Sequence, residues 1–258
     1  MRILLVNDDG FDSPLLHVLC RATAERGHEV LVSAPHMQQS AKSHAFTISG
    51  PLLVHPGRME GAKEAWRVEG TPVDACRLGL LGLYEGPFDL VISGINAGYN
   101  IGLATYVSGT VGAAREAAFQ HVLSMAVSLE PRTPEETVKR FASWCVQLGE
   151  RLRDMDCPPM TLINVNAPPI PWNEIRGAKI CPLNRHVYKD GYTRAISPRG
   201  TTYFWLSDEI EDMEPEADTD LDELHKGYLS LTFMGPEGYS DMQNRSLDLP
   251  SINGSSDL

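Results

Sequence analysis

The segment Arg2-Ile3-Leu4-Leu5-Val6-Asn7-Asp8-Asp9-Gly10 places a short apolar run directly before two carboxylates and a glycine. Such a run predicts a buried strand followed by a turn. Ser13-Pro14 then supplies an N-cap residue with proline at the first helical position, and Gly27 ends the predicted helix. A second apolar stretch, Glu29 to Ser33, completes a strand–helix–strand order. This order is typical of a parallel, right-handed βαβ unit.

The same alternation continues along the chain and predicts an α/β fold with a Rossmann-like, doubly wound, mostly parallel sheet. A long glycine-rich loop is expected from Gly94 to Gly109, and Leu229 to Phe233 is expected to return to a sheet. The remaining strands are expected at 46–49, 52–55, 66–69, 88–93, 122–129 and 161–166, and helices at 71–83, 110–120 and 134–155.

The chain changes character after about residue 185. We expect a catalytic core at 1–185, and at 186–258 a hairpin arm, an acidic loop and a C-terminal oligomerisation segment. Residues 189–207 are polar and aromatic, which suggests a projecting β-hairpin whose aromatic rings find little core. Aromatic residues are enriched at protein interfaces, so the arm predicts a homodimer or larger assembly. The acidic run 209–222 has two interpretations: a solvated, mobile loop or a second cation site. The last residues, 251–258, are expected to be disordered.

Composition limits the possible partners. The 258 residues include 22 basic and 34 acidic side chains, a net charge of −12 that argues against binding duplex nucleic acid. No run approaches the ~18 apolar residues of a membrane span, and the first apolar run is too short for a signal-peptide core. Five widely spaced cysteines are typical of reduced thiols in a cytosolic protein. We therefore expect a cytoplasmic enzyme without a membrane partner.

Oxygen-bearing side chains converge at one edge of the predicted sheet, because ligands of open parallel sheets bind beyond the carboxyl ends of the strands. Asp8 and Asp9 follow the first strand, Ser40 lies in the loop after the second, and Asn96 follows the strand at 88–93. Adjacent carboxylates are costly to bury unless they are paired or bound to metal. Asp, Asn and Ser supply the oxygen ligands that Mg²⁺ or Mn²⁺ prefers. The pattern predicts one divalent cation.

The phosphate signal is Ser108-Gly109-Thr110 at the start of a predicted helix. Hydroxyls and free backbone N–H groups at a helix N-terminus form an anion site. The glycines of 94–102 are spaced by four, which is not the dinucleotide fingerprint, and no phosphate-loop Gly-Lys-Ser/Thr sequence is present.

Taken together, these residues resemble the SurE (survival protein E) family of 5′/3′-nucleotidases. The matching segments are Asn7-Asp8-Asp9-Gly10, Ala34-Pro35, Gln39-Ser40, Thr47, residues 70–74, 93–102 and 108–114, with weaker matches at 164–166 and 219–220. The resemblance implies metal-dependent hydrolysis of nucleoside 5′-monophosphates, and of 3′-monophosphates as well. It implies a metal ion held at Asp8, Asp9, Ser40 and Asn96, with phosphate near Asn96, Ser108, Gly109 and Thr110. It also implies a homodimer or homotetramer built through the hairpin and an exchanged C-terminal tail.

The sequence departs from the family pattern at three places. Ala41 stands where the family usually has glycine, and Ala104 where it usually has aspartate. Thr232-Phe233-Met234 replaces a usual Thr-Pro-Leu. Ala104 removes a carboxylate close to the expected phosphate site, while the four presumed metal ligands are intact.

Hydrolysis of a phosphate monoester needs an acceleration of up to ~10²¹-fold, and a lone general base supplies only roughly 10²–10⁴. A metal ion polarises the phosphoryl oxygens, delivers hydroxide and orients both reactants. We therefore predict direct in-line attack by metal-activated water, with Asp8 and Asp9 as the catalytic residues. Two alternatives stay open. One is an aspartyl-phosphate phosphatase, although Asn7 would occupy its nucleophile position, and the other is a non-catalytic regulatory protein that binds a nucleotide or phosphate.

Overall fold

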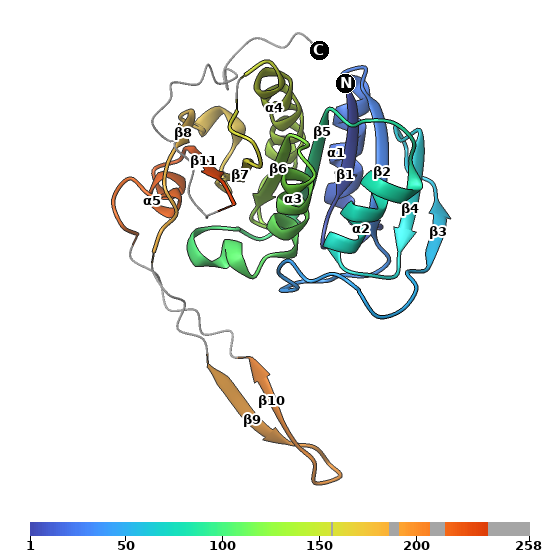
Figure 1. The fold of residues 1–258 in the computed structure, drawn as a ribbon. Helices are drawn as coiled ribbons and strands as arrows, with labels where there is room; N and C mark the ends of the chain where they lie inside the picture. The colour runs from blue at the N-terminus through green and yellow to red at the C-terminus, as the bar shows by residue number, and fades with distance from the viewer. Residues whose placement is uncertain (156, 186–190, 207–214, 237–258) are drawn as a thin grey trace.

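A sheet of nine strands, in the order β3-β4-β2-β1-β5-β6-β7-β11-β8, organises the described part of the chain (Figure 1). The computed structural model describes residues 1–155, 157–185, 191–206 and 215–236. The parallel strands are β1 (Arg2–Val6), β2 (Glu29–Pro35), β4 (Glu64–Val68), β5 (Leu90–Ala97), β6 (Ser124–Leu129) and β7 (Leu162–Ala167). β3 (Val54–Gly57) and β11 (Leu229–Met234) run antiparallel to β4 and β7, and β8 (Ala178–Ile180) pairs parallel with β11. The predicted α/β class with a mostly parallel sheet is confirmed.

Helices cover both faces of this sheet, because successive side chains of a strand point to opposite faces. Ile3 and Leu5 of β1 pack in one cluster with α1 (Pro14–Glu25) and α4 (Glu135–Arg153). Leu4 and Val6 pack in a second cluster with α2 (Pro72–Leu78) and α3 (Gly109–Phe119). Residues 3–6 of β1 are all apolar because they are buried on both faces of the sheet. This is the doubly wound arrangement that the sequence predicted.

The topological switch point lies between β1 and β5, which are neighbours in the sheet. From β1 the chain passes outward to β2 and β4, and from β5 it passes the other way to β6 and β7. Loops that leave neighbouring strands in opposite directions open a crevice at their carboxyl ends. The two adjacent aspartates follow β1 at this crevice, and Asn96 lies near the end of β5.

Shorter helical segments complete the core. They are the π-helical turn η1 (Gly79–Leu83), the 3₁₀ turns η2 (Gly102–Tyr106) and η3 (Trp172–Glu174), and the helix α5 (Asp220–His225). No helix among the described residues is both long and apolar enough to cross a membrane.

The strands β9 (Tyr192–Ile196) and β10 (Thr202–Leu206) form a separate antiparallel hairpin. Figure 1 shows this arm projecting from the bottom of the molecule, the end toward which the arrow of β4 points. Its large side chains are exposed, with Tyr192 at 71% and Trp205 at 69% of their full accessibility. The predicted hairpin is therefore present and carries aromatic surface that the core does not cover.

Two sequence predictions about the strands are wrong. Residues 46–49 do not form a strand; Thr47 instead gives its N–H and hydroxyl to Asp74 at 2.7 and 2.8 Å. The strand expected to stop at Ser93 continues through Gly94 to Ala97 as β5. An ideal Cβ on Gly94 would lie 2.3 Å from the carbonyl oxygen of Val127, so glycine lets β5 approach β6 closely and extend.

The acidic run has two interpretations, a solvated, mobile loop or a second cation site, and its described C-terminal end is not a solvated loop but the start of α5 (Asp220–His225). Asp220 is fully buried at the first position of α5. Residues 209–214 of the run lie outside the described residues, as do the predicted exchanged tail and the disordered terminus at 251–258. β11 lies between β7 and β8, so residues from beyond 186 contribute to the main sheet, as predicted for 229–233.

Candidate active site

The turn after β1 is rigidly held. The side-chain amide of Asn7 donates to the carbonyl oxygen of Gly10 at 2.8 Å. Gly10 has a φ of +96°, and an ideal Cβ there would lie 3.1 Å from the backbone of Met37. The N–H of Gln39 donates to the carbonyl oxygen of Asp8 at 2.7 Å. The loop after β2 therefore lies directly on the aspartate turn.

Asp8 is a buried carboxylate, with only 4% of the residue exposed. Burial is the largest influence on its pKa, and the charge of Asp9 adds to it, while hydrogen bonds from the hydroxyl and N–H of Thr110 act in the opposite direction. The net effect raises the pKa of Asp8 to about 6. A carboxylate held in this way binds either a proton or a cation near neutral pH.

Asp9 is less buried and points across the switch point. Its Oδ2 accepts the N–H of Ala97, at the end of β5, at 3.0 Å. Burial raises the pKa of Asp9, although this hydrogen bond and one from the side chain of Gln38 lower it in part. Asp9 therefore joins the ends of β1 and β5 while its carboxylate stays accessible.

Asn96 precedes Ala97 on β5 and is half-buried. Its amide nitrogen donates to the carbonyl oxygen of Gly98 at 2.7 Å. This bond fixes the amide orientation and leaves the oxygen without a hydrogen-bond donor among the described residues. The sequence prediction of Asn96 as an oxygen ligand is consistent with that orientation.

The start of α3 lies against Asp8. An ideal Cβ on Gly109 would lie 3.1 Å from Asp8 Oδ2, so the absence of a side chain there leaves room for the carboxylate beside the helix. Ser108 is the N-cap, and its hydroxyl accepts the N–H of Val111 at 3.1 Å. Thr110, expected to bind phosphate, instead gives its hydroxyl to Asp8. The start of α3 therefore stabilises the negative charge of Asp8.

Ser40 is exposed and forms no hydrogen bond to the described residues. The structure places it next to Gln39, which is bonded to the Asp8 backbone. Asp8, Asp9, Asn96 and the start of α3 are therefore joined by direct contacts or through neighbouring residues, and Ser40 is adjacent to them.

Comparison with known proteins identifies the family of this chain. A family model described as Survival protein SurE matches residues 3–190. The chain belongs to the SurE family. A protein of Nitratidesulfovibrio vulgaris (strain DP4) named 5′-nucleotidase SurE is 39% identical over 232 residues, covering 90% of this chain and 92% of that protein. A relative of the same name from Synechococcus sp. (strain JA-3-3Ab) is 38% identical over 241 residues, covering 92% of each chain.

A solved SurE protein has the same fold. The crystal structure of the SurE protein from Aquifex aeolicus superposes with a TM-score of 0.76 and 32% sequence identity. The match covers 91% of this chain and 93% of that chain. The resemblance to the SurE family inferred from the sequence is therefore confirmed over nearly the whole length.

The glycine-rich segment of this SurE chain is anchored by buried amides that sequence reasoning did not assign. The N–H of Asn100 donates to Asn166 Oδ1 at 2.9 Å, and the Asn100 amide donates to Ser128 at 2.9 Å. Asn164 and Asn166 in turn donate to the carbonyl oxygen of Asn100 at 2.7 and 3.0 Å. This network ties the segment to the ends of β6 and β7, and the only sequence signal for it was the Asn-Val-Asn spacing.

Asp220 holds the other end of the same segment. Its carboxylate accepts the N–H groups of Gly102 and Asn184 at 2.8 and 2.7 Å. Burial raises the pKa of Asp220, and these hydrogen bonds counter that effect only partly. The weak family match at Thr219-Asp220 therefore corresponds to a structural anchor for the loop that follows Asn96.

The two family departures near the site have different surroundings. Ala41 has a φ of 56°, a left-handed conformation that favours glycine, so the alanine is held there under strain. Ala104 lies on η2, and the N–H groups of Val107 and Ser108 both donate to its carbonyl oxygen at 3.1 Å. Replacing the usual aspartate with alanine leaves this backbone turn formed.

The second cation site considered for the acidic run is occupied by a lysine. Asp218, Asp222 and Glu223 lie close enough together to hold an ion. The ammonium group of Lys226 lies 2.6 Å from Asp222 and 3.0 Å from Glu223, and Lys179 lies 2.7 Å from Glu223. Two ammonium groups therefore already contact the three carboxylates and offset most of their charge.

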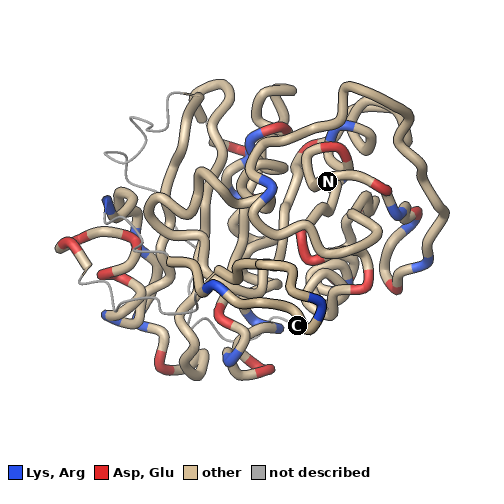
Figure 2. The backbone as a smooth tube through the Cα atoms, turned by 90° about the horizontal axis from the view of Figure 1, so that it is seen from below, with Lys and Arg blue, Asp and Glu red and all other residues tan. Residues whose placement is uncertain are grey.

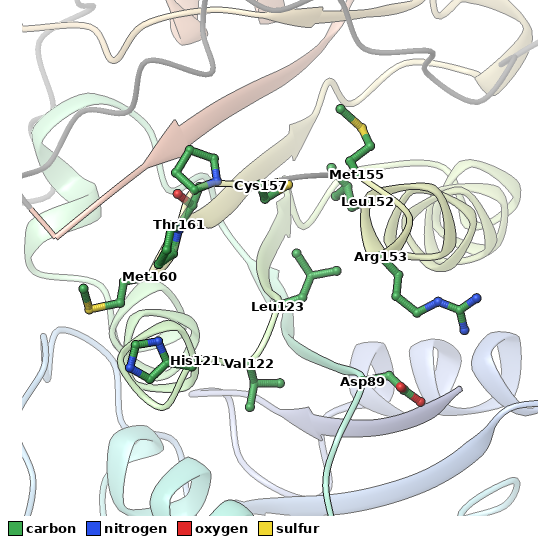
Figure 3. A pocket seen from close by; sticks show the side chains of 12 residues that line it. Asp89, His121, Val122, Leu123, Leu152, Arg153, Met155, Cys157, Met160 and Thr161 are labelled. Carbon is green, nitrogen blue, oxygen red and sulfur yellow. The ribbon is translucent and has the colours of Figure 1, made fainter.

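A cavity of about 380 Å³ lies at the amino-terminal ends of β6 and β7, away from the carboxyl ends that carry the aspartates (Figure 3). Its walls include Leu123 and Thr161, near the starts of β6 and β7, together with His121, Arg153 and Cys157. The cavity shares no residue with the carboxylate site.

Charges on the end of the molecule that carries the arm are mixed. Figure 2, which views the backbone from that side, shows Lys and Arg positions interspersed with Asp and Glu positions along the chain.

Proposed function

We propose that this SurE protein is a metal-dependent phosphomonoesterase that hydrolyses nucleoside 5′-monophosphates, and 3′-monophosphates as well, to nucleoside and phosphate. One observation carries the proposal: Asp8 and Asp9 meet the end of β5 and the start of α3 at the topological switch point. The names of the relatives, 5′-nucleotidase SurE, supply the substrate class.

The residues at the site fit a divalent metal ion. Every proposed donor is an oxygen atom, from Asp8, Asp9, Ser40 and Asn96, and such donor sets suit Mg²⁺ or Mn²⁺. The raised pKa of Asp8 indicates a buried carboxylate that its protein neighbours stabilise only in part. When bound, one such ion supplies activation of the attacking water and neutralises charge on the phosphoryl oxygens.

The residues of the site have separate roles in the proposed reaction. Thr110 orients the Asp8 carboxylate, so Asp8 is committed to binding the cation. Asp9 is more accessible and is the better placed of the two to orient the attacking water and accept its proton. The Ser108 hydroxyl, the Gly109 N–H at the α3 terminus and the Asn96 side chain are the proposed contacts of the phosphate.

The aspartyl-phosphate alternative fits poorly, because Asn7 occupies the position of its nucleophile. Asn7 is fully buried, and its amide holds the turn through the carbonyl of Gly10. An amide in this role is not a nucleophile toward phosphorus. Direct attack by water is therefore the proposed route.

Two further parts of the proposal concern assembly and location. The exposed aromatic residues of the arm favour a homodimer or homotetramer. Four of the five cysteines are buried thiols without a disulfide, which favours the cytoplasm.

The test is phosphate release from AMP by purified, folded protein with Mn²⁺ or Mg²⁺. We expect turnover with either ion, loss of turnover in EDTA, recovery on adding the ion back, and poor recovery with Ca²⁺ because it tolerates looser geometry. Absence of phosphate release across a panel of phosphomonoesters and metals would favour the regulatory binding protein. A labelled acyl-phosphate after acid quench would instead establish the aspartyl-phosphate route.

A further inference from the structure

The loop that carries Ser40 is fixed at both of its ends. At one end the N–H of Gln39 donates to Asp8 O at 2.7 Å. At the other, Ser43 gives its N–H to Val107 O at 2.9 Å and its hydroxyl to Tyr106 O at 2.6 Å. Only three residues, 40–42, span the distance between these anchors. The positions of these three residues relative to Asp8 therefore depend on where Ser43 is held.

This second anchor uses one side of α3. An ideal Cβ on Gly112 would lie 2.2 Å from the carbonyl oxygen of Ser43, so the loop backbone touches the helix there. One turn further along, the Oε2 atom of Glu116 lies 3.0 Å from His44 Nε2. Residues four apart lie on the same face of a helix. Gly112 and Glu116 thus hold the loop, while Gly109 and Thr110 of the same helix hold Asp8.

Glu116 is a buried carboxylate that joins three elements. Its side chain is 3% exposed, and besides contacting His44 it accepts hydrogen bonds from Arg77 of α2 at 2.6 Å and from Gln120, the residue after α3, at 3.0 Å. His44 also stacks on Phe119, with ring centroids 5.4 Å apart. Burial by itself raises the pKa of Glu116, but the hydrogen bonds from His44 and Gln120 and the charge of Arg77 outweigh it, and the pKa is lowered. The group is therefore ionised and held in place.

The backbone of the span and of its second anchor, Ser43, is strained, which shows that the contacts of the anchors determine the conformation of the loop. Ala41 and Ser43 have φ values of 56° and 53°, in the left-handed region. This conformation is unfavourable for residues other than glycine, and it persists only where the surroundings impose it.

We infer that Glu116 is a positioning residue of the active site, which acts through His44 to hold Ser40 beside Asp8 and Asp9. The inference rests on the proposed function, since Ser40 is a proposed ligand of the metal ion. The role of Glu116 is indirect, because its carboxylate contacts His44, Arg77 and Gln120 and not Asp8 or Asp9.

The test compares variants of the full-length protein by Mn²⁺ titration calorimetry without substrate, alongside kinetics with AMP. His44→Leu should raise the Kd for Mn²⁺ by roughly 10–100-fold, the loss typical of removing a group that orients a metal ligand. His44→Gln retains a donor toward Glu116 and should restore most of the affinity. The matched control is Gln120→Leu, which removes a bond of the same 3.0 Å length from Glu116 but leaves the loop untouched. Its Kd for Mn²⁺ should stay near the wild-type value.

A double-mutant cycle separates positioning from general stability. In the Glu116→Leu background, His44→Leu should have little further effect on the Kd, because the contact is already gone. Additive effects, or a His44→Leu variant that binds Mn²⁺ as the wild type does, would overturn the inference. If Glu116→Leu does not fold, the His44→Leu and His44→Gln pair still decides.

Amide hydrogen exchange distinguishes failure of the inference from failure of the proposed function. His44→Leu should speed exchange at the N–H groups of Gln39 and Ser43, whereas Gln120→Leu should not. A wild-type protein that binds no divalent ion would refute the proposed function, and the exchange data would then still decide whether His44 and Glu116 hold the loop. An active, metal-binding wild type with unchanged exchange in His44→Leu would refute the inference alone.

Discussion

At the scale of single residues, Asp8 and Asp9 are adjacent in sequence but differ in surroundings. Asp8 is buried against α3, and Asp9 reaches the end of β5. Burial, rather than repulsion between the two charges, is the main reason for the raised pKa of Asp8. Substitution of either residue therefore tests a different environment.

Replacement of either aspartate by asparagine should separate activity from stability. We expect Asp8→Asn and Asp9→Asn each to lower kcat by roughly 10²-fold or more, since even partners that only orient a ligand are worth ~10–100-fold. The Tm of the metal-free protein should stay level or rise, with the larger gain for Asp8→Asn because Asp8 is more buried. Phosphate-release assays and thermal melts in EDTA provide the measurements. Near-wild-type turnover in both variants would contradict the site assignment.

The raised pKa of Asp8 predicts how the stability of the metal-free protein depends on pH. The folded state binds the proton more tightly, with a pKa of about 6 against an ordinary value of 3.8. Below the lower value both states are protonated and no penalty exists. As pH rises toward 6 the unfolded state loses its proton first, so stability falls, by about 3 kcal/mol in total.

This pH effect is isolated by comparison with Asp8→Asn, which lacks the titrating group. The unfolding free energy of Asp8→Asn minus that of the wild type should grow between about pH 4 and pH 6 and then level off. Urea titrations in EDTA at several pH values measure it. Parallel curves for the two proteins would show that Asp8 does not titrate in this range.

Thr110 was expected to bind phosphate, but its hydroxyl is bonded to Asp8. Thr110→Ala removes a hydrogen bond that lowers the pKa of Asp8, so protons should compete better with the metal ion. We expect weaker Mn²⁺ binding near pH 6 and a smaller loss at pH 8, with Thr110→Ser as the control that keeps the hydroxyl. An effect on KM for AMP alone, with the Mn²⁺ Kd unchanged, would instead support a direct phosphate contact.

At the scale of elements, the loop after β2 contains a strained alanine. Ala41 has a φ of 56°, and glycine adopts this conformation without the clash of a Cβ. Ala41→Gly should therefore stabilise the protein by up to roughly 1 kcal/mol. Ala45→Gly in the same loop is the matched control, because Ala45 has no positive φ and should lose stability through the added freedom of the unfolded chain. Urea denaturation measures the unfolding free energy of the two variants. A change of the same sign in both would contradict the inferred strain at Ala41.

At the scale of the whole molecule, the arm predicts the state of assembly. Side chains such as Tyr192, Phe204 and Trp205 are exposed on β9 and β10. We expect light scattering at micromolar concentration to give a dimer or tetramer of the 28.4 kDa chain. Phe204→Asp with Trp205→Asp should shift the mass toward the monomer, while Arg199→Asp at the hairpin turn should not. A monomeric wild type would refute the assembly.

The sequence by itself determined the fold class, because fully buried parallel strands must be apolar on both faces and the helices between them must be amphipathic. The run Ile3 to Val6 and the Ser13-Pro14 helix start carried that information locally. The order of the loops also placed Asp8, Asp9 and Asn96 at one edge, since parallel strands end together.

Tertiary structure alone decided which atoms those residues meet. Thr110 lies 102 positions from Asp8 in the chain, and Glu116 lies 72 from His44. No local pattern specifies such pairs, because they depend on how α3 packs against β1 and the loop after β2. The extension of β5 through Gly94 and the burial of Asp220 were likewise decided by packing. A glycine usually marks a loop, but the close approach of β5 to β6 keeps Gly94 in a strand. An acidic run usually marks a loop as well, but three backbone N–H groups donate to the buried Asp220 carboxylate and hold it in place.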